Sequence, residues 1–303
     1  HPDADTARSG FLEEESRSVP LRSTERNFKD PNPKPELVYA LEPFWGLNGF
    51  RPPTEIEAWF SWLAPEALRP EVDILQRDPS QKGLAAMLRS LLYMEGTRRQ
   101  EVLDRAQEKV TRVDGEQKAD PLHWLAVLLR EYPKDIGVLS AVFLQLMHLE
   151  PGQAAFLPPG RLHAYLHGLG LELMANSDNV LRAGLTPKHM DVPELLRIMH
   201  FEHSPVQILT AQGGGEGESA LEAMAEEFAL SVIELDPESP QRRCLSPGIE
   251  IVLCARGDIQ LGDEQNGSWR LGQGEAVCIP ACVSSWTISG QGKVFRAQPG
   301  QGA

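Results

Sequence analysis

The sequence predicts a mainly β protein with a helical insertion, made of two β-barrels and an all-α unit. Three observations lead to this expectation. Short apolar runs separated by Gly or Pro turns fill the C-terminal third, as is typical of sandwiches and barrels. Residues 54–131 instead carry apolar side chains at helical spacing. A spacing of Gly, five residues and Pro occurs twice, from Gly152 to Pro158 and from Gly274 to Pro280.

Composition excludes several function classes. The chain has 303 residues, enough for two or three domains, and its 41% hydrophobic and 24% charged residues are those of an ordinary globular protein. A formal net charge of −14 disfavours nonspecific binding to nucleic acid or anionic lipid. The sequence contains neither a signal peptide nor an apolar run as long as a membrane span. We therefore expect a cytoplasmic monomer with no nucleic-acid or membrane partner.

The N-terminal 36 residues are polar and Pro-rich. They open on His1 without an initiator Met, so we expect a fragment or a processed product. They end in the segment 28–36, where three prolines within five residues exclude a helix. We expect an extended, stiff loop there, followed by a short buried strand at 37–41.

Helix start signals recur through residues 54–131. Thr54 and Glu57 have the spacing of a capping box, and Asp78 and Asp120, each followed by Pro, mark two further starts. We find no residues in this unit that indicate chemistry.

From residue 132 the pattern changes to strands. An apolar run that we interpret as extended spans 138–150, and a further helix is predicted from Asp191 through Ile198. The other predicted strands are 155–157, 164–166, 228–232, 249–254, 258–261, 276–279, 286–288 and 294–297, with a turn expected at residues 290–292. The predicted domains are 1–53 with 132–200, then 54–131, then 201–303.

The frame from Gly152 to His163 gives the first indication of chemistry. Its Pro and Gly residues shape a turn that places His163 inside a barrel mouth, where a metal is shielded and reached from one side. This frame resembles the second motif of the cupin barrel, a double-stranded β-helix or jelly roll. In the second copy Ser285 stands where the first has His163. We therefore expect two cupin barrels, one chemical and one structural, with the helical unit inserted into the first.

Two more residues are candidate metal ligands beside His163. Glu36 follows a rigid Pro-Lys-Pro run that would hold its carboxylate, although an exposed loop carboxylate is the alternative, and His1 opens the chain. Zinc takes His and carboxylate ligands, and the same set also suits non-haem iron. Many polar side chains lie between residues 172 and 188, and such groups are costly to bury unless each finds a partner. This stretch predicts an active-site wall.

The run from His163 to Lys188 resembles the long signature of type I mannose-6-phosphate isomerases, also called phosphomannose isomerases. It fits that signature over 26 residues without a mismatch. A second family signature fits residues 28–36 with two departures, Phe28 for Tyr and Pro33 for His. The resemblance extends over nearly the whole chain.

The resemblance implies a zinc enzyme that interconverts mannose 6-phosphate and fructose 6-phosphate, with one Zn²⁺ per chain. It implies zinc ligands at His1, Glu36 and His163, and a Gln two residues before His1, outside this chain. The first barrel is then expected to be incomplete at its N-terminus. The catalytic Arg of the family falls on Arg182, although an ion pair with Asp178, four residues earlier, is an alternative role for it.

The expected partner is a phosphorylated hexose. The residues proposed to bind it are Lys34, Tyr165, Glu172, Asp178 and Lys188. Lys34 and Lys188 are candidates for the phosphate or the sugar hydroxyls, and the general base stays open among Glu172, Asp178 and Lys34. Proline at position 33 bears on the rate more than on the fold.

Other functions remain open at this point. A degenerate, noncatalytic cupin would use its barrels for sugar binding or protein contact, and both Pro33 and the Gln outside this chain favour it. An iron cupin oxygenase would use the same His1, Glu36 and His163. A guanylyltransferase would share a C-terminal cupin, but we find no nucleotide-binding Gly-rich loop.

Overall fold

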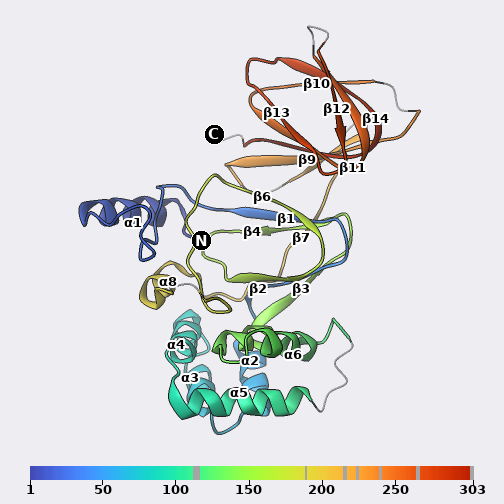
Figure 1. Cartoon of the computed structure of the whole chain (residues 1–303). Helices are drawn as coiled ribbons and strands as arrows, with labels where there is room; N and C mark the ends of the chain where they lie inside the picture. Colours follow the sequence, from blue (N-terminus) through green and yellow to red (C-terminus); the bar gives the residue numbers. More distant parts are fainter. Residues whose placement is uncertain are drawn as a thin grey trace.

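The structure is a computed structural model, and it describes residues 1–111, 117–187, 190–213, 217–222, 225–238, 241–263 and 267–300. Most helices lie at one end of the molecule, two sheets lie in the middle, and a strand-rich unit lies at the other end (Figure 1). The protein is mainly β with helices, as the sequence predicts. Within the described ranges, none of the helices combines the length and the hydropathy needed to span a bilayer.

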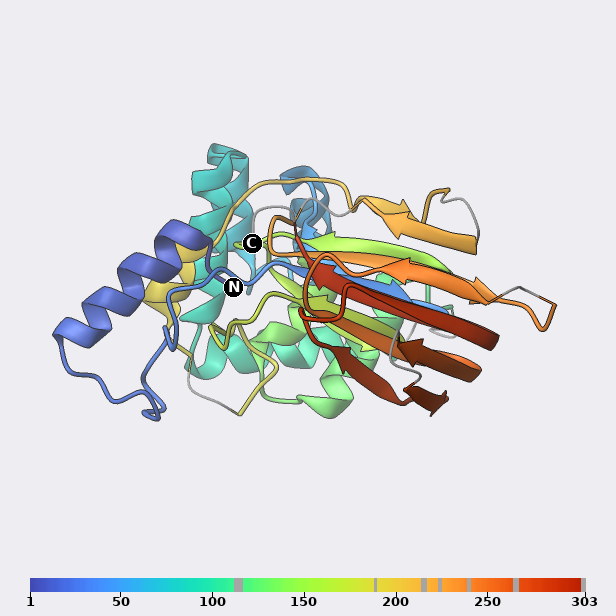
Figure 2. The same ribbon diagram turned by 90° about the horizontal axis from the view of Figure 1, so that it is seen from above.

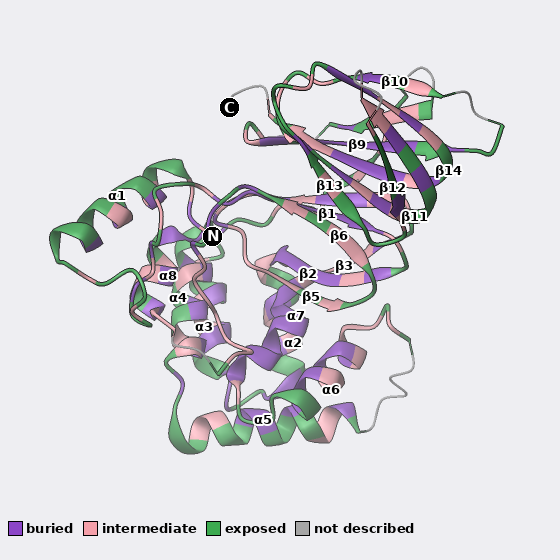
Figure 3. Ribbon diagram, turned by 45° about the horizontal axis from the view of Figure 1, so that its top comes forward, coloured by how far each residue is buried: buried purple, intermediate pink, exposed green. Residues whose placement is uncertain are grey.

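The helical unit packs on the middle of the molecule through one apolar core. Phe60, Met87 and Leu125 from its helices are buried in the same cluster as Leu47 and Phe50 from a strand of the middle sheets. Figure 3 shows α7 buried along its whole length, whereas α2 buries only the face that carries Ile56, Phe60 and Leu63. The helices of this unit are α2 (Pro53–Leu63), α3 (Arg69–Arg77), α4 (Gln81–Leu92), α5 (Gly96–Val110), α6 (Pro121–Glu131), the 3-10 helix η1 (Ile136–Leu139) and α7 (Ser140–Phe143).

Two predicted helix starts are wrong in detail. The capping box at Thr54 and Glu57 is not formed, because α2 has no side-chain cap and starts on a proline. Helix α4 is capped by the hydroxyl of Ser80 rather than by Asp78. Asp120 caps α6, as predicted. Proline near a helix start still marks the position correctly, because the N–H it lacks has no partner there anyway.

An N-terminal helix, α1 (Ala4–Ser16), was not predicted. Asp3 caps it by accepting a hydrogen bond from the backbone N of Thr6. The helix is mostly polar and buries little, so no apolar period indicated it. Figures 1 and 2 place α1 beside α8 (Val192–Ile198). Helix α8 itself was predicted from the sequence. The segment 28–35 has no helix or strand, as the prolines predict.

Two antiparallel sheets form the middle of the molecule. The strand order is β6-β1-β4-β7 in the four-stranded sheet and β3-β2-β5 in the three-stranded sheet. The pairing of β7 with β4 extends the four-stranded sheet beyond residue 200. The strands are β1 (Glu36–Ala40), β2 (Phe44–Phe50), β3 (Leu144–Leu149), β4 (Gln153–Leu157), β5 (His163–His167), β6 (Gly170–Met174) and β7 (Ile208–Thr210).

The apolar run 138–150 is strand only in its second half. Residues 136–143 are helical, and β3 begins at Leu144. Residues 136–144 are all buried, and a run without alternation does not distinguish a buried helix from a buried strand. The strands predicted at 155–157 and 164–166 are confirmed as parts of β4 and β5.

The C-terminal unit contains a seven-stranded antiparallel sheet. Two long strands, β11 and β14, stand where the sequence predicted four short ones. Gly290 and Gly292, expected to form a turn, stay paired with Ile259 and Gly257 of β11. Glycine inside a strand permits a bend without ending the pairing. The strands are β8 (Glu218–Leu221), β9 (Phe228–Leu235), β10 (Arg242–Leu245), β11 (Glu250–Asp263), β12 (Ser268–Gly272), β13 (Ala276–Ile279) and β14 (Ser285–Pro299).

Gly152 and Gly274 occupy matching turns in the middle sheets and in the C-terminal unit. Their φ angles are 97° and 85°, a backbone that residues with side chains rarely adopt. Each glycine precedes a short strand, β4 or β13, which ends next to Pro158 or Pro280. The spacing repeated in the sequence therefore corresponds to a repeated turn and strand.

The C-terminal unit buries an ion pair. The Glu250 carboxylate is 1% exposed and accepts hydrogen bonds from Arg296, from the indole of Trp286 at 3.0 Å and from the amide of Gln298 at 2.7 Å. Both oxygens are engaged, which offsets the cost of removing the charge from water. Ser285, in the position that corresponds to His163, is 2% exposed and accepts from Nε of Arg243.

Candidate metal centre

Three side chains from distant parts of the chain meet in the middle of the molecule. Nε2 of His1 lies 3.1 Å from Oε1 of Glu36, and Nε2 of His163 lies 3.1 Å from Oε2 of the same carboxylate. The ligand atoms of the three residues lie within 4.8 Å of one another, and the described part of the chain holds no other such group. The structure therefore brings together the three residues nominated from the sequence.

The backbone fixes each member of the cluster. Glu36 and His163 are the first residues of β1 and β5. Because ladder hydrogen bonds set the backbone position of a strand residue, the Cα and Cβ atoms of Glu36 and His163 are held in place. His1 is tied to the turn before β5, since the backbone N of Gly160 donates to its carbonyl at 2.7 Å.

Backbone carbonyls orient both imidazoles. Nδ1 of His1 lies 2.9 Å from the carbonyl oxygen of Asn179, and Nδ1 of His163 lies 3.0 Å from that of Arg161. A carbonyl only accepts, so each Nδ1 carries the hydrogen in the neutral ring and each Nε2 keeps its lone pair. Metal-binding histidines are commonly held in this way.

The cluster has the chemistry of a divalent metal site. Burial raises the pKa of Glu36, but hydrogen bonds and charge interactions with His1 and His163 outweigh it and lower that pKa from 4.5 to about 2. A divalent cation can take the place of the Nε2 hydrogens in these two contacts, and it would then be held by the ionised carboxylate and two imidazole lone pairs. Two imidazoles and one carboxylate fit zinc, and they fit non-haem iron as well.

Lys34 lies next to the cluster. Its Nζ is 3.8 Å from Oε1 of Glu36, and its side chain is 11% exposed. The Pro-Lys-Pro run therefore delivers both a carboxylate and an ammonium group to one place. Lys34, predicted to bind the substrate, thus lies beside a candidate metal ligand.

Tyr165 and Glu172 come from two different sheets, and each shares a strand face with a residue of the cluster. Tyr165 follows His163 by two positions on β5, so the two side chains share a face of the strand. Glu172 on β6 lies opposite Val38 of β1, and Val38 is two positions from Glu36. The carboxylates of Glu36 and Glu172 therefore lie on the same face of the four-stranded sheet. The Tyr165 hydroxyl donates to Oε1 of Glu172 at 2.7 Å. Burial and the nearby carboxylates raise the pKa of Tyr165, so its hydroxyl stays protonated and keeps that donor.

A cavity of about 350 Å³ is lined by His1, His163 and Tyr165. Its lining also contains Arg161 and Arg182, and none of the described Asp or Glu residues takes part. The cavity is therefore cationic although the chain as a whole is acidic. Such a cavity favours an anionic ligand.

Of the predicted site residues, His1, His163, Tyr165 and Arg182 line this cavity, and Asp178 does not. Asp178 is exposed, and its backbone N donates to a carboxylate oxygen of Asp30 at 2.8 Å. The residues around it are not helical, so the four-residue spacing that would pair Asp178 with Arg182 in a helix does not apply. Lys188 lies outside the described residues.

Sequence reasoning did not assign roles to Arg161 or Asn179. Both contribute a main-chain carbonyl to a histidine of the cluster. Any residue type has a carbonyl, so only the local backbone path reveals this role. Arg161 also lines the cavity, and burial lowers the pKa of its guanidinium.

Comparison with known sequences gives a consistent set of relatives. The chain is 37% identical over 300 residues to the mannose-6-phosphate isomerase of Escherichia coli (strain K12), an alignment that covers 98% of this chain and 74% of that enzyme. The mannose-6-phosphate isomerase of Salmonella typhimurium is 37% identical with the same coverage of each chain. No family profile matches the chain.

Comparison with solved structures finds the same group of proteins. A crystal structure of the Salmonella typhimurium mannose 6-phosphate isomerase, bound to its substrate fructose 6-phosphate and zinc, has a TM-score of 0.88 and 33% identity. It matches 99% of this chain and 74% of that one. A mannose 6-phosphate isomerase bound with zinc and yttrium also has a TM-score of 0.88 and 33% identity, over 99% and 75% of the two chains.

Proposed function

The chain belongs to the mannose-6-phosphate isomerase family, and we propose that its His1, Glu36 and His163 cluster holds the zinc ion with which it interconverts mannose 6-phosphate and fructose 6-phosphate. One observation carries the assignment to these residues. Two imidazoles, each held by a carbonyl at Nδ1, direct Nε2 at one buried carboxylate. The solved relative bound to fructose 6-phosphate and zinc supports both the metal and the substrate.

We assign the cluster to a first cupin barrel built from the four- and three-stranded sheets. The seven-stranded unit is then a second barrel without a metal. The repeated turn at Gly152 and Gly274 supports this assignment, as does Ser285 in the position of His163. The helical unit enters the first barrel between β2 and β3.

The reaction moves a proton from one carbon of the sugar to its neighbour through an enediol. A zinc ion in this site supplies a Lewis acid for the sugar oxygens. Arg182 is suited to the negative charge of the enediolate, because a guanidinium stays protonated and donates a fork of hydrogen bonds. The cationic lining also suits the phosphate of the substrate, for which Lys188 remains a candidate.

Of the groups considered for the base, Glu172 has the best support. Its carboxylate shares a strand face with the metal ligand Glu36 and receives the Tyr165 hydroxyl, which lines the cavity. We propose that Glu172 takes the proton from one carbon and returns it to the next. Lys34, whose Nζ lies 3.8 Å from Oε1 of Glu36, is placed to donate a hydrogen bond to a sugar oxygen.

Metal removal tests the proposed function. In a coupled assay with mannose 6-phosphate, we expect turnover to disappear after chelator treatment and to return with added zinc, because the site loses and then regains its Lewis acid. Turnover that persists after metal analysis shows the protein to be zinc-free would contradict the proposal. A zinc-loaded protein without turnover would support the noncatalytic sugar-binding alternative.

Removing the Tyr165 hydroxyl is expected to have a smaller effect. In Tyr165→Phe, Glu172 loses its 2.7 Å donor, and we expect kcat/KM to fall by about 5- to 10-fold, the worth of one hydrogen bond of about 1 to 1.5 kcal/mol. Steady-state kinetics provide the measurement. Tyr93→Phe is the matched control, since Tyr93 is 50% exposed on the helical unit. Equal kinetics for the two variants would remove Tyr165 from the site.

A further inference from the structure

We propose that Asn179 is a positioning residue for the metal centre, one that sets the orientation of His1 and the path of the chain toward Glu36. The proposal rests on the proposed function, because it takes the His1, Glu36 and His163 cluster to be the metal site. Asn179 does not contact the ligand atoms itself. It acts through its main chain on one ligand and through its side chain on the segment that leads to another.

The main chain of Asn179 holds His1. Its carbonyl oxygen lies 2.9 Å from Nδ1 of His1, and Nε2 of the same ring faces Glu36 at 3.1 Å. A shift of this carbonyl therefore rotates the imidazole or changes which nitrogen carries the hydrogen. Either change turns a lone pair away from the metal.

The side chain of Asn179 fixes where that carbonyl lies. The residue is fully buried, and its amide is used on both sides. Oδ1 accepts from the backbone N of Lys29 at 2.7 Å and of Asp30 at 3.3 Å. Nδ2 donates to the carbonyl of Asp30 at 2.8 Å, to that of Asn32 at 3.0 Å and to Oδ1 of Asp30 at 3.3 Å. An amide has two donors and two acceptor sites, so this one is saturated.

The segment that Asn179 holds runs directly into the metal ligands. Residues 29–32 lead to the Pro-Lys-Pro run, and β1 begins with Glu36. The backbone N of Lys34 also donates to the carbonyl of Pro2 at 3.4 Å, next to His1. Asn179 therefore joins the segments that carry two of the three ligands.

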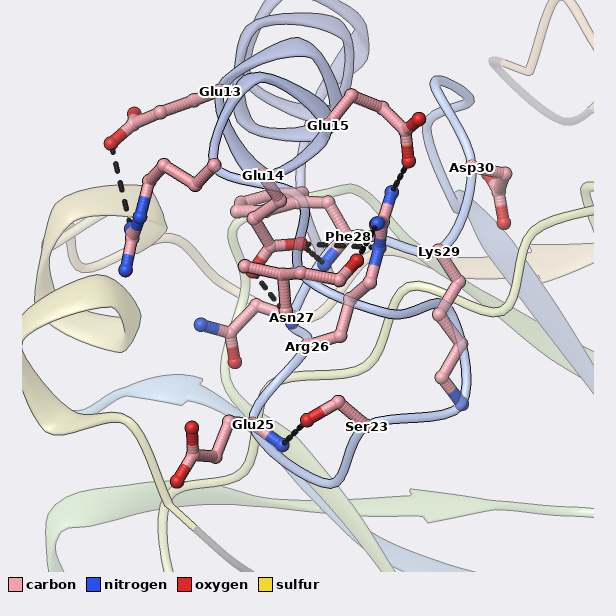
Figure 4. Close-up of polar contacts among 12 residues, drawn as sticks. Glu13, Glu14, Glu15, Ser23, Glu25, Arg26, Asn27, Phe28, Lys29 and Asp30 are labelled. Atoms are coloured by element: carbon pink, nitrogen blue, oxygen red, sulfur yellow. Dashed lines mark hydrogen bonds and ion pairs between the residues drawn. The ribbon is translucent and has the colours of Figure 1, made fainter.

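Helix α1 holds the beginning of the same segment. The Glu14 carboxylate accepts from the backbone N of Asn27 at 2.9 Å and from that of Phe28 at 2.8 Å, and Figure 4 shows these contacts below the helix. Arg26 donates to the carbonyl of Phe28 at 2.7 Å. The bonds from Glu14 reach the segment at Asn27 and Phe28. The bonds from Asn179 begin at the next residue, Lys29. Glu14 thus stabilises the same loop without any bond to a metal ligand, which makes it a matched control for Asn179.

The test compares zinc affinity in three variants, measured by competition with a chromophoric chelator. Asn179→Ala removes every side-chain bond to residues 29–32, and Asn179→Asp keeps the acceptor but loses the Nδ2 donor. We expect zinc affinity to fall by about 10- to 100-fold in Asn179→Ala, the range typical of outer partners of metal ligands, and by less in Asn179→Asp. In Glu14→Gln, zinc affinity is expected to stay within about 2-fold of the parent.

A second readout separates positioning from general loss of stability. We expect the ligand-field absorption of the cobalt-loaded protein to change in both Asn179 variants and to remain unchanged in Glu14→Gln, even where the metal-free proteins melt at similar temperatures. If the Asn179 variants and Glu14→Gln show the same zinc affinity and the same cobalt spectrum, the residue is only structural. Should Asn179→Ala fail to fold, Asn179→Asp decides the question alone. A parent protein that binds no zinc would overturn the proposed function instead, so the two failures can be told apart.

Discussion

Replacing Glu36 with glutamine is expected to lower turnover by more than about 100-fold and to remove zinc from the protein. Outer partners of metal ligands are already worth about 10- to 100-fold, and Glu36 is the only carboxylate in the cluster. Its two oxygens face the two imidazole nitrogens at 3.1 Å each. Glutamine is neutral, and it would direct an NH2 group at one of those nitrogens in place of an oxygen.

The measurement is kcat together with the zinc content per chain. Glu14→Gln is the control, because it makes the same chemical change at a carboxylate that is 7% exposed and bonded to backbone N–H groups. We expect this control to lose stability but to keep its zinc and most of its turnover. A Glu36→Gln protein with one zinc per chain and parental turnover would show that the metal lies elsewhere.

Replacing Arg182 with lysine is expected to lower kcat by about 100- to 1000-fold with zinc content unchanged. The loss of one donor to a developing oxyanion has this magnitude in other enzymes. Lysine keeps the positive charge in the cavity but lacks the planar fork of donors. The fall in kcat therefore measures the contribution of the hydrogen-bond geometry of Arg182, separately from that of its charge.

The division between kcat and KM identifies what Arg182 contacts. A fall in kcat with little change in KM is expected for a group that acts on the enediolate. A rise in KM alone would contradict this and would place Arg182 on the phosphate. Arg197→Lys is the control, since Arg197 on α8 pairs with Glu194 at 2.5 Å, and its side chain is 49% exposed.

The barrel frame around His163 was predictable from the sequence because the turn depends on residue type. A Gly with positive φ and a Pro that ends the strand leave a spacing that can be counted, and Gly152 and Pro158 have it. His1 and Glu36 were weaker candidates than His163 by spacing alone, and the family resemblance then supported both. Their meeting with His163 depends on contacts between segments more than a hundred residues apart, which no local pattern contains.

The remaining errors also have physical causes. Helix α1 is mostly polar, and it is held by Glu14, whose partners lie at Asn27 and Phe28, outside the helix. The run before Leu144 is buried on all sides, so its helical half carried no period. The role of Asn179 depends on its carbonyl as much as on its side chain. Backbone groups are common to all residues, and sequence reading assigns them no role.

Anomalous diffraction at the zinc absorption edge tests the central claim most directly. On crystals of the zinc-loaded protein, we predict one anomalous peak per chain, located between Nε2 of His1, Nε2 of His163 and the carboxylate of Glu36. Data collected below the edge should lose that peak, which distinguishes zinc from iron. An active, zinc-containing protein whose anomalous peak lies away from these three residues would contradict the account.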